Sequence, residues 1–165
     1  MRSKIKAYLK EIIMFVAVMF LAANALSYYR SMSLNEVTLP QEEFKLIDGR
    51  SYRFSHAKPL MVHFWGTWCP VCRVEAPNIE FISKRFDVLS VAVNSSDDRS
   101  IIEYMQNNGL TFSVLNDKEG ALAHRYGVGV FPTTLIYNAR GELIFQDVGY
   151  TSIFMLYLKM VWASL

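Results

Sequence analysis

The sequence predicts an α/β fold with a mixed central sheet flanked by helices and preceded by an N-terminal transmembrane helix. Apolar, β-branched runs alternate with helical segments, and the last two runs are arranged as a hairpin. Near the N-terminus, 18 consecutive residues carry no charge. We therefore divide the 165 residues into a tail and anchor at 1–30, a linker at 31–41 and an α/β domain at 42–165.

The uncharged stretch, residues 12–29, would form a helix about 27 Å long, close to the roughly 30 Å hydrocarbon core of a bilayer. Four basic residues precede it: Arg2, Lys4, Lys6 and Lys10. Their charge favours a cytoplasmic N-terminus and a domain outside the membrane. A cleaved signal peptide is the alternative, because Ala23-Asn24-Ala25 resembles a cleavage site. Both interpretations export the domain, whereas a buried core helix would leave the cation cluster unexplained.

The charge distribution argues against nucleic acid as a partner. The net charge is +2, but the chain from Arg30 onward carries 13 basic and 14 acidic residues. The basic excess therefore comes from the N-terminal tail, and no basic face is predicted on the domain.

The predicted elements alternate along the domain. Strands are expected at 44–47, 52–54, 60–65, 88–93, 112–115, 133–137 and 143–146, and helices at 69–85, 97–107, 120–126 and 151–165. The predicted buried stripe of the first helix comprises Val74, Phe81, Ile82 and Phe86, and Pro77 is expected to kink that helix. The last helix is apolar nearly all round, so we expect it to pack on the sheet.

The two cysteines of the chain form one motif, Cys69-Pro70-Val71-Cys72, between a predicted strand and a predicted helix. At a helix N-terminus, the dipole and the free N–H groups favour a thiolate. Two sulfurs at this spacing can close a disulfide or open that of a partner. They cannot form a Cys₄ zinc site, and Arg73 stands where a c-type haem motif has histidine. No metal or organic cofactor is expected; a static disulfide remains the alternative.

Two distant segments carry a resemblance to a known family. Residues 65–77, Trp-Gly-Thr-Trp-Cys-Pro-Val-Cys-Arg-Val-Glu-Ala-Pro, resemble the active site of membrane-anchored, thioredoxin-like thiol–disulfide oxidoreductases of the bacterial cell envelope. Residues 127–134, Gly-Val-Gly-Val-Phe-Pro-Thr-Thr, resemble the cis-proline loop that lies against that site. The resemblance covers roughly residues 40–165 and implies a thioredoxin fold. Within the family the chain most resembles the suppressor-of-copper-sensitivity D type, to which the cytochrome c maturation thiol reductase and other TlpA-like proteins are related.

The resemblance implies a role for each matched position. Cys69 would be the attacking thiolate and Cys72 the buried resolving thiol. Pro132 would be cis, and the backbone beside it would pair with a substrate strand. The expected substrate contacts are Trp68, Pro70, Val71 and Phe131.

Glu75 and His63 are the two candidates for proton chemistry. Glu75 lies one helical turn past Cys72. In related envelope reductases a glutamate at this place is taken to tune the thiol pKa or relay a proton; the alternative is an ordinary solvated glutamate. His63 lies on the central strand, where many thioredoxins carry a buried aspartate. It is expected to titrate nearer neutral pH and to shift thiol reactivity or act as a base. Its alternative is a buried, hydrogen-bonded histidine.

The resemblance implies a single-pass inner-membrane protein with its catalytic domain on the periplasmic side. It would exchange disulfides with protein partners, as a reductase supplied by a membrane-embedded thiol reductase. A disulfide-forming oxidase is one alternative. The other is a non-catalytic binding module that retains the fold and a structural disulfide.

Overall fold

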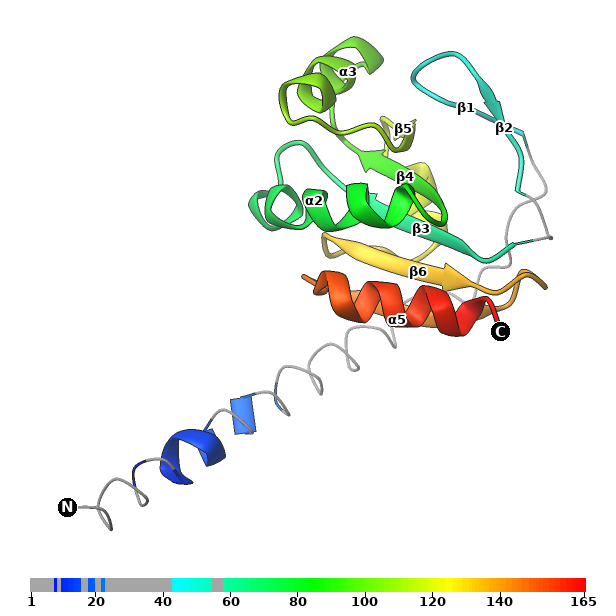
Figure 1. Cartoon of the computed structure of the whole chain (residues 1–165). Coiled ribbons are helices and arrows are strands. Elements are labelled where there is room, and N and C mark those ends of the chain that lie inside the picture. The colour runs from blue at the N-terminus through cyan, green and yellow to red at the C-terminus, as the bar shows by residue number, and fades with distance from the viewer. Residues whose placement is uncertain (1–7, 9, 16–17, 20–21, 23–42, 55–57) are drawn as a thin grey trace.

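The computed structural model describes residues 8, 10–15, 18–19, 22, 43–54 and 58–165 (Figure 1). Within these residues, no helix is both long enough and apolar enough to cross a bilayer. Most of the predicted span at 12–29, and all of the predicted linker at 31–41, lie outside the described residues.

The domain is built on a five-stranded sheet in the order β5-β4-β3-β6-β7 (Figure 1). The strands are β3 (Leu60–Trp65), β4 (Asp87–Val93), β5 (Ser113–Asp117), β6 (Thr133–Tyr137) and β7 (Leu143–Val148). β4 pairs in parallel with β3 and β5, whereas β6 pairs antiparallel with β3 and β7. This arrangement confirms the predicted mixed sheet. Every residue of the central strand β3 is buried, as expected for a strand covered on both faces.

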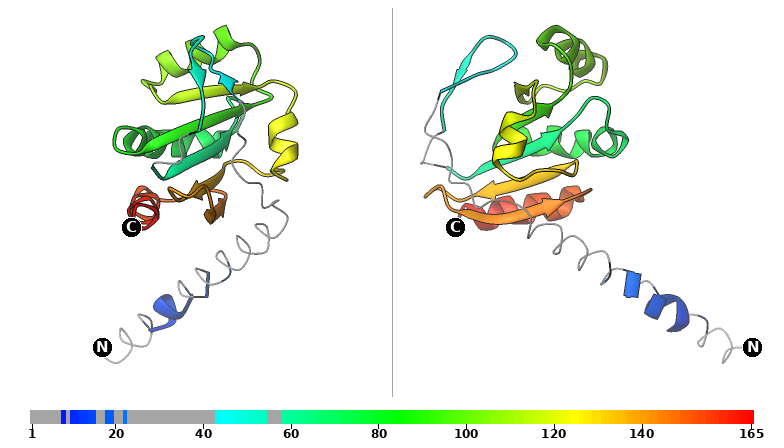
Figure 2. Two further views of the ribbon diagram at one scale, coloured as in Figure 1. Left: turned by 90° about the vertical axis from the view of Figure 1, so that its right-hand side faces the viewer. Right: turned by 180° about the vertical axis from the view of Figure 1, so that it is seen from behind.

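Helices cover both faces of the sheet (Figure 2). They are α2 (Pro70–Ser83), α3 (Asp98–Asn107), α4 (Ala121–Arg125) and α5 (Ile153–Ala163). The hydrophobic cluster on one face joins residues of α2, α3 and α5, and the cluster on the other face joins residues of α4. A short hairpin of β1 (Phe44–Lys45) and β2 (Ser51–Tyr52) is attached to the sheet where the Ile47 N–H donates to the Val114 carbonyl at 3.0 Å. Its strands are shorter than predicted, while the other elements match the predicted ones to within a few residues.

Helix α2 begins where the sequence predicts, with Cys69 as its N-cap and Pro70 in its first turn. The helix continues through Pro77. Its buried face differs from the predicted stripe, because Val74 is 68% exposed and Phe81 is 37% exposed. The buried side chains of α2 are Cys72, Glu75, Ala76, Ile79, Glu80 and Ile82. Two carboxylates thus occupy the sheet side of the helix while two apolar side chains face solvent, which hydropathy alone would not predict.

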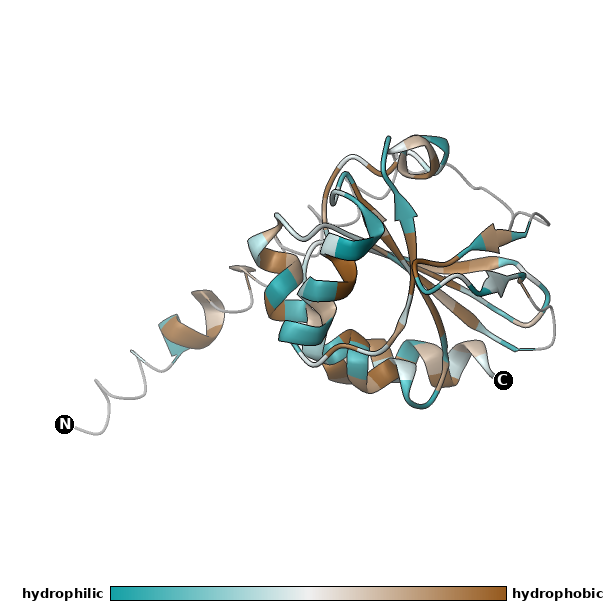
Figure 3. Ribbon diagram, turned by 90° about the horizontal axis from the view of Figure 1, so that it is seen from above, coloured by the Kyte–Doolittle hydropathy of each residue, from teal (hydrophilic) through white to brown (hydrophobic). Residues whose placement is uncertain are grey.

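Helix α5 packs against α2 and β6, as predicted for an apolar C-terminal helix. Leu156, Met160 and Ala163 form its buried stripe. Its outer face carries apolar side chains as well, since Phe154 and Trp162 are each more than 60% exposed. Much of the α5 ribbon has the brown colour of hydrophobic residues in Figure 3.

The burial pattern of α2 leads to a stability prediction. Ile79 is fully buried, so Ile79→Ala should lower the free energy of unfolding by about 2–5 kcal/mol through lost burial and the cavity that remains. Val74→Ala, on the exposed side of the same helix, should change it by less than about 0.5 kcal/mol. Urea unfolding of the oxidised protein measures both. If both variants lost the same amount of unfolding free energy, the result would contradict the observed orientation of α2.

Candidate active site

A disulfide joins Cys69, the N-cap of α2, to Cys72 in the first turn of that helix, directly after the turn that follows β3. The Cys72 N–H donates to the Sγ of Cys69 at 3.2 Å. An N–H in this position would also stabilise a Cys69 thiolate once the disulfide is reduced. The exposed fractions are 4% for Cys69 and 2% for Cys72. Both residues are therefore buried in the oxidised state, and Cys69 is only slightly more exposed than Cys72.

Trp68 is held in a defined position beside the disulfide. Its Nε1–H donates to the Val93 carbonyl at 3.1 Å, and its ring meets that of Phe131 edge to face with centroids 5.5 Å apart. A Cβ on Gly66 would lie 2.6 Å from the Trp68 ring, so this glycine permits the close approach. Trp68 nevertheless remains 54% exposed and forms part of the surface next to the cysteines.

The Phe131–Pro132 peptide bond is cis, as the sequence comparison within the family implies. The contact between Phe131 and Trp68 brings this loop against the cysteine turn, although the two motifs lie far apart in the sequence. Pro132 itself is buried, and its carbonyl accepts a hydrogen bond from the Gly149 N–H at 2.8 Å. Of the predicted substrate contacts, Pro70 and Val71 are exposed and Phe131 is half-buried.

An open groove of about 540 Å³ continues from Phe131 along α4. Its lining includes Val93, Ala121, Val128 and backbone at Gly120. Asn94, Glu119 and His124 also line it, so the groove presents a mixed apolar and polar surface on the side where the cis-proline loop lies.

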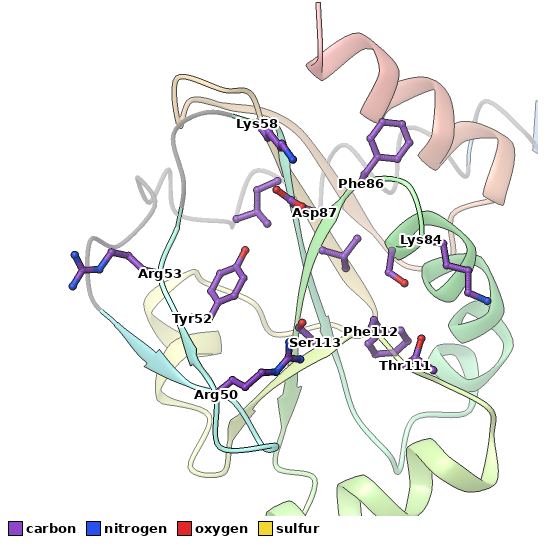
Figure 4. Close-up of a pocket in the computed structure, with 13 residues that line it drawn as sticks. Arg50, Tyr52, Arg53, Lys58, Lys84, Phe86, Asp87, Thr111, Phe112 and Ser113 are labelled. Atoms are coloured by element: carbon purple, nitrogen blue, oxygen red, sulfur yellow. The ribbon is translucent and has the colours of Figure 1, made fainter.

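A second cavity, of about 390 Å³, lies near the start of β3, at the opposite end of that strand from the cysteines (Figure 4). Four basic residues line it: Arg50, Arg53, Lys58 and Lys84. Three of these cations pair with carboxylates, at 2.7 Å for Arg50–Asp48, 3.8 Å for Arg53–Glu43 and 3.3 Å for Lys84–Glu80. Because most of its charge is compensated, the cavity does not form a strongly basic site.

Glu75 is fully buried, so the alternative of a solvated helix glutamate is wrong. Its Oε1 accepts a hydrogen bond from the Thr151 N–H at 2.7 Å, and its Oε2 has no hydrogen-bond partner within the described part of the chain. Burial raises the pKa of Glu75 to about 8, against the Thr151 bond that lowers it, and the Asp147 charge raises it further. Glu75 is therefore largely protonated at neutral pH, which makes it a reservoir for one proton next to Cys72.

His63 is buried, and its Nδ1 lies 2.9 Å from the Oγ1 of Thr134. Burial lowers the pKa of His63 to about 3. The expected titration near neutral pH is therefore wrong for the folded state, because an ion at this depth would be poorly solvated. The hydrogen-bonded, buried histidine is the alternative that the structure supports.

An ion pair that the sequence did not predict lies close to Glu75. Lys159 of α5 donates to both carboxylate oxygens of Asp147 on β7, and both side chains are more than four-fifths buried. The available signal was that Lys159 is the single charge in the otherwise apolar segment 151–165. Asp147 escaped notice because the predicted strand ended one residue before it.

The remaining candidates have structural roles or lie on the surface. Trp65 is buried, and its Nε1–H donates to the Oγ of Ser90 at 3.1 Å. His124 is exposed. Among the described residues, no group of three or more His, Cys, Asp or Glu side chains could hold a metal ion.

The raised pKa of Glu75 predicts a particular dependence of stability on pH. The folded protein retains a proton that the unfolded chain loses above pH 4.5. Stability therefore falls as the pH rises from 4.5 to about 8, by up to about 1.4 kcal/mol per pH unit. Glu75→Gln should remove this slope. Urea unfolding of the oxidised protein across this range measures it, and an unchanged slope would mean that Glu75 is ionised in the fold.

The lowered pKa of His63 predicts that stability changes with pH in the opposite direction at lower pH. The unfolded chain binds a proton below pH 6.5, whereas buried His63 stays neutral down to about pH 3. Stability should therefore fall as the pH decreases from 6.5 toward 3, and His63→Gln should flatten that decline. Because this range overlaps that of Glu75, each variant is compared with the wild type separately. If the stability of His63→Gln falls with decreasing pH as steeply as that of the wild type, the decline is caused by other titrating groups.

Comparisons with known proteins agree with this geometry. The model of the AhpC/TSA family matches residues 33–146. A "Thioredoxin-like protein" of Haemophilus influenzae is 28% identical over 166 residues, 98% of each chain. "Thiol-disulfide oxidoreductase ResA" of Geobacillus thermodenitrificans is 30% identical over 112 residues, 64% of each chain. Among solved structures, the exposed lipoprotein thioredoxin Etrx1 of Streptococcus pneumoniae shares the fold, with a TM-score of 0.64 and 24% identity over 74% of this chain and 98% of that one.

The described domain therefore has a thioredoxin-like α/β fold, with a mixed sheet and a disulfide at the start of α2. The chain belongs to the AhpC/TSA family and is a thioredoxin-like thiol–disulfide oxidoreductase.

Proposed function

We propose that this protein reduces disulfides of exported proteins on the periplasmic side of the bacterial inner membrane. One observation carries the proposal: the Cys69–Cys72 pair lies at the N-terminus of α2, with the buried carboxyl of Glu75 one turn further along the helix. A helix N-terminus favours the thiolate of Cys69, and Glu75 supplies a proton site where solvent is excluded.

The reaction begins with the reduced pair. The Cys69 thiolate attacks one sulfur of the partner's disulfide, a mixed disulfide forms, and the partner's other sulfur leaves as a thiolate that takes up a proton. Cys72 then loses its proton and attacks the Sγ of Cys69, which releases the second partner thiolate. In total, the partner gains two electrons, which the cysteine pair loses. Its two thiolates take up two protons, one equivalent to the proton that Cys72 releases and one from solvent, which balances the proton that Cys69 lost on forming the thiolate.

Glu75 and His63 have different roles in this proposal. Because its pKa is about 8, Glu75 exchanges its proton near neutral pH, where it accepts a proton from Cys72 in the second step or returns one afterwards. His63 remains neutral and holds Thr134 in place by the 2.9 Å hydrogen bond, so we assign it a positioning role.

The substrate is expected to bind over Trp68, Val71 and Phe131. These side chains form an exposed or half-exposed apolar rim around the buried disulfide. An extended segment of the partner would pair with backbone of the cis-proline loop and place apolar side chains in the adjacent groove.

The membrane anchor remains part of the proposal. The uncharged stretch at 12–29 and the basic residues before it support a single span with the domain outside. The description of the pneumococcal structure as an exposed lipoprotein supports an envelope location. With this anchor and a Cys-Pro-Val-Cys motif, the suppressor-of-copper-sensitivity D type is the subtype we propose. Its electrons would come from a membrane-embedded thiol reductase.

Insulin reduction by the full-length protein in detergent tests the catalytic role. The wild type should accelerate reduction by dithiothreitol, and Cys69→Ser should abolish the acceleration because no thiolate is left to attack. Val74→Ala, on the solvent side of α2, is the matched control and should retain the wild-type rate. A wild-type rate no faster than the uncatalysed one would favour the binding module with a structural disulfide.

The direction of electron flow follows from the reduction potential. Equilibration with glutathione should give a potential of about −250 mV or lower if the protein is a reductase. A potential well above that of glutathione would favour the disulfide-forming oxidase instead. Cys72→Ser should then trap the natural partner as a mixed disulfide for identification.

A further inference from the structure

A row of polar side chains crosses the face of the sheet that α2 and α5 cover. His63 on β3 pairs in register with Thr134 on β6, and Thr134 pairs in register with Asp147 on β7. Directly opposed residues in antiparallel strands share a face, so the three side chains lie next to one another. The His63–Thr134 hydrogen bond links the first two. The row therefore leads through an apolar core from the central strand to the edge strand of the sheet.

Lys159 meets the outer end of this row. Its Nζ lies 2.5 and 2.6 Å from the two carboxylate oxygens of Asp147 and 5.6 Å from the centroid of the Phe145 ring. The side chains of Lys159 and Asp147 are 18% and 16% exposed. Apolar residues often replace such a buried ion pair without loss of stability. Docking of α5 therefore does not by itself require charge at these two positions.

Glu75 reaches the same region from α2. Its carboxyl is held to the chain just before α5 by the 2.7 Å hydrogen bond from the Thr151 N–H. Asp147 from β7 acts on Glu75 directly and raises its pKa, and Lys159 of α5 is paired with Asp147. His63 on β3 begins the same row but is neutral, and Cys72 lies on the same helix as Glu75. A cation at position 159 opposes the effect of the Asp147 anion, because opposite charges shift the pKa of a nearby carboxyl in opposite directions.

We propose that Asp147 and Lys159 are positioning residues that set the proton affinity of Glu75 and, through Glu75, the pH range in which the cysteine pair reacts. The second part rests on the proposed role of Glu75 in proton transfer. With the pair intact, the Asp147 anion raises the pKa of Glu75, and the Lys159 cation bound to it limits that effect. Removal of either partner leaves one uncompensated charge beside the Glu75 carboxyl in a region that solvent screens poorly.

The two single variants should therefore have opposite effects. Asp147→Asn leaves the Lys159 cation and lowers the pKa of Glu75, whereas Lys159→Met leaves the Asp147 anion and raises it. We expect the pKa of Glu75 to move by about one pH unit from the wild-type value in each variant, which is a tenfold change in the ratio of protonated to ionised Glu75. Carbon-13 NMR titration of the Glu75 carboxyl in the oxidised full-length protein measures the shift. The ultraviolet absorbance of the thiolate, followed against pH in the reduced protein, measures the effect on Cys69.

Controls separate this electrostatic role from a structural one. Lys159→Arg keeps the positive charge, so the pKa of Glu75 should equal the wild-type value in this variant. The double variant Asp147→Asn with Lys159→Met removes both charges, and its Glu75 pKa should also lie near the wild-type value. If Lys159→Met does not fold, Lys159→Gln replaces it. Shifts of the same sign in both single variants, or no shift in either, would overturn the proposal, since a pair needed only for packing predicts equal destabilisation and an unmoved titration.

Glu75→Gln distinguishes this proposal from the proposed function. In one outcome, Glu75→Gln leaves the pH dependence of the thiolate unchanged, while Asp147→Asn and Lys159→Met still shift the pKa of Glu75 in opposite directions. The control of Glu75 by the ion pair then stands, and the link between Glu75 and the thiol chemistry is overturned. In the other outcome, Glu75→Gln changes the pH dependence of the thiolate, but the pKa of Glu75 is the same in Asp147→Asn and Lys159→Met. The role of Glu75 in the thiol chemistry then stands, and the role of the ion pair is overturned.

Discussion

The redox site depends on one local constraint, namely that Cys69 is at once the last residue of a strand-to-helix turn and the N-cap of α2. A sulfur in that position receives the N–H of Cys72 and the positive end of the helix dipole. The turn is fixed because β3 is the central strand, paired in parallel on one side and antiparallel on the other. The chemistry of the cysteine pair is therefore built on the most buried strand of the sheet.

Buried polar groups on and around α2 differ in their partners. The pKa of Glu80, near the end of α2, is lowered despite its burial, because Thr111 donates two hydrogen bonds at 2.7 Å and Lys84 lies 3.3 Å away. Asp147 on β7 has an ion-pair partner in Lys159. Glu75 and His63 each have one hydrogen-bonding neighbour and no opposite charge paired with them, and burial drives both toward the neutral form.

These differences bear on function. A carboxyl whose pKa is about 8 is largely protonated at neutral pH but close enough to its midpoint to give or take a proton as the cysteine pair changes its redox state. A neutral histidine cannot attract a thiolate by charge, so the central strand of this protein supplies position rather than an ion. In the proposed mechanism, proton exchange takes place on the α2 side of the disulfide, and the partner contacts the side of Trp68 and Phe131.

Much of the fold followed from local patterns. β3 and β6 occupy the predicted residues, and Pro132 is cis as the resemblance implies. Periodicity failed on α2, where it assigned Val74 and Phe81 to the core and overlooked Glu75 and Glu80. A hydropathy pattern ranks side chains by transfer to an apolar phase, and it cannot include a hydrogen bond that a distant residue will supply.

By itself, the sequence determined that two thiols stand at a helix start, because that depends on neighbours along the chain. Only the tertiary structure decided which groups around them carry charge. Thr151, Asp147 and Lys159 reach Glu75 from segments more than 70 residues away, and pKa values depend on burial and distance in space rather than on position in the sequence.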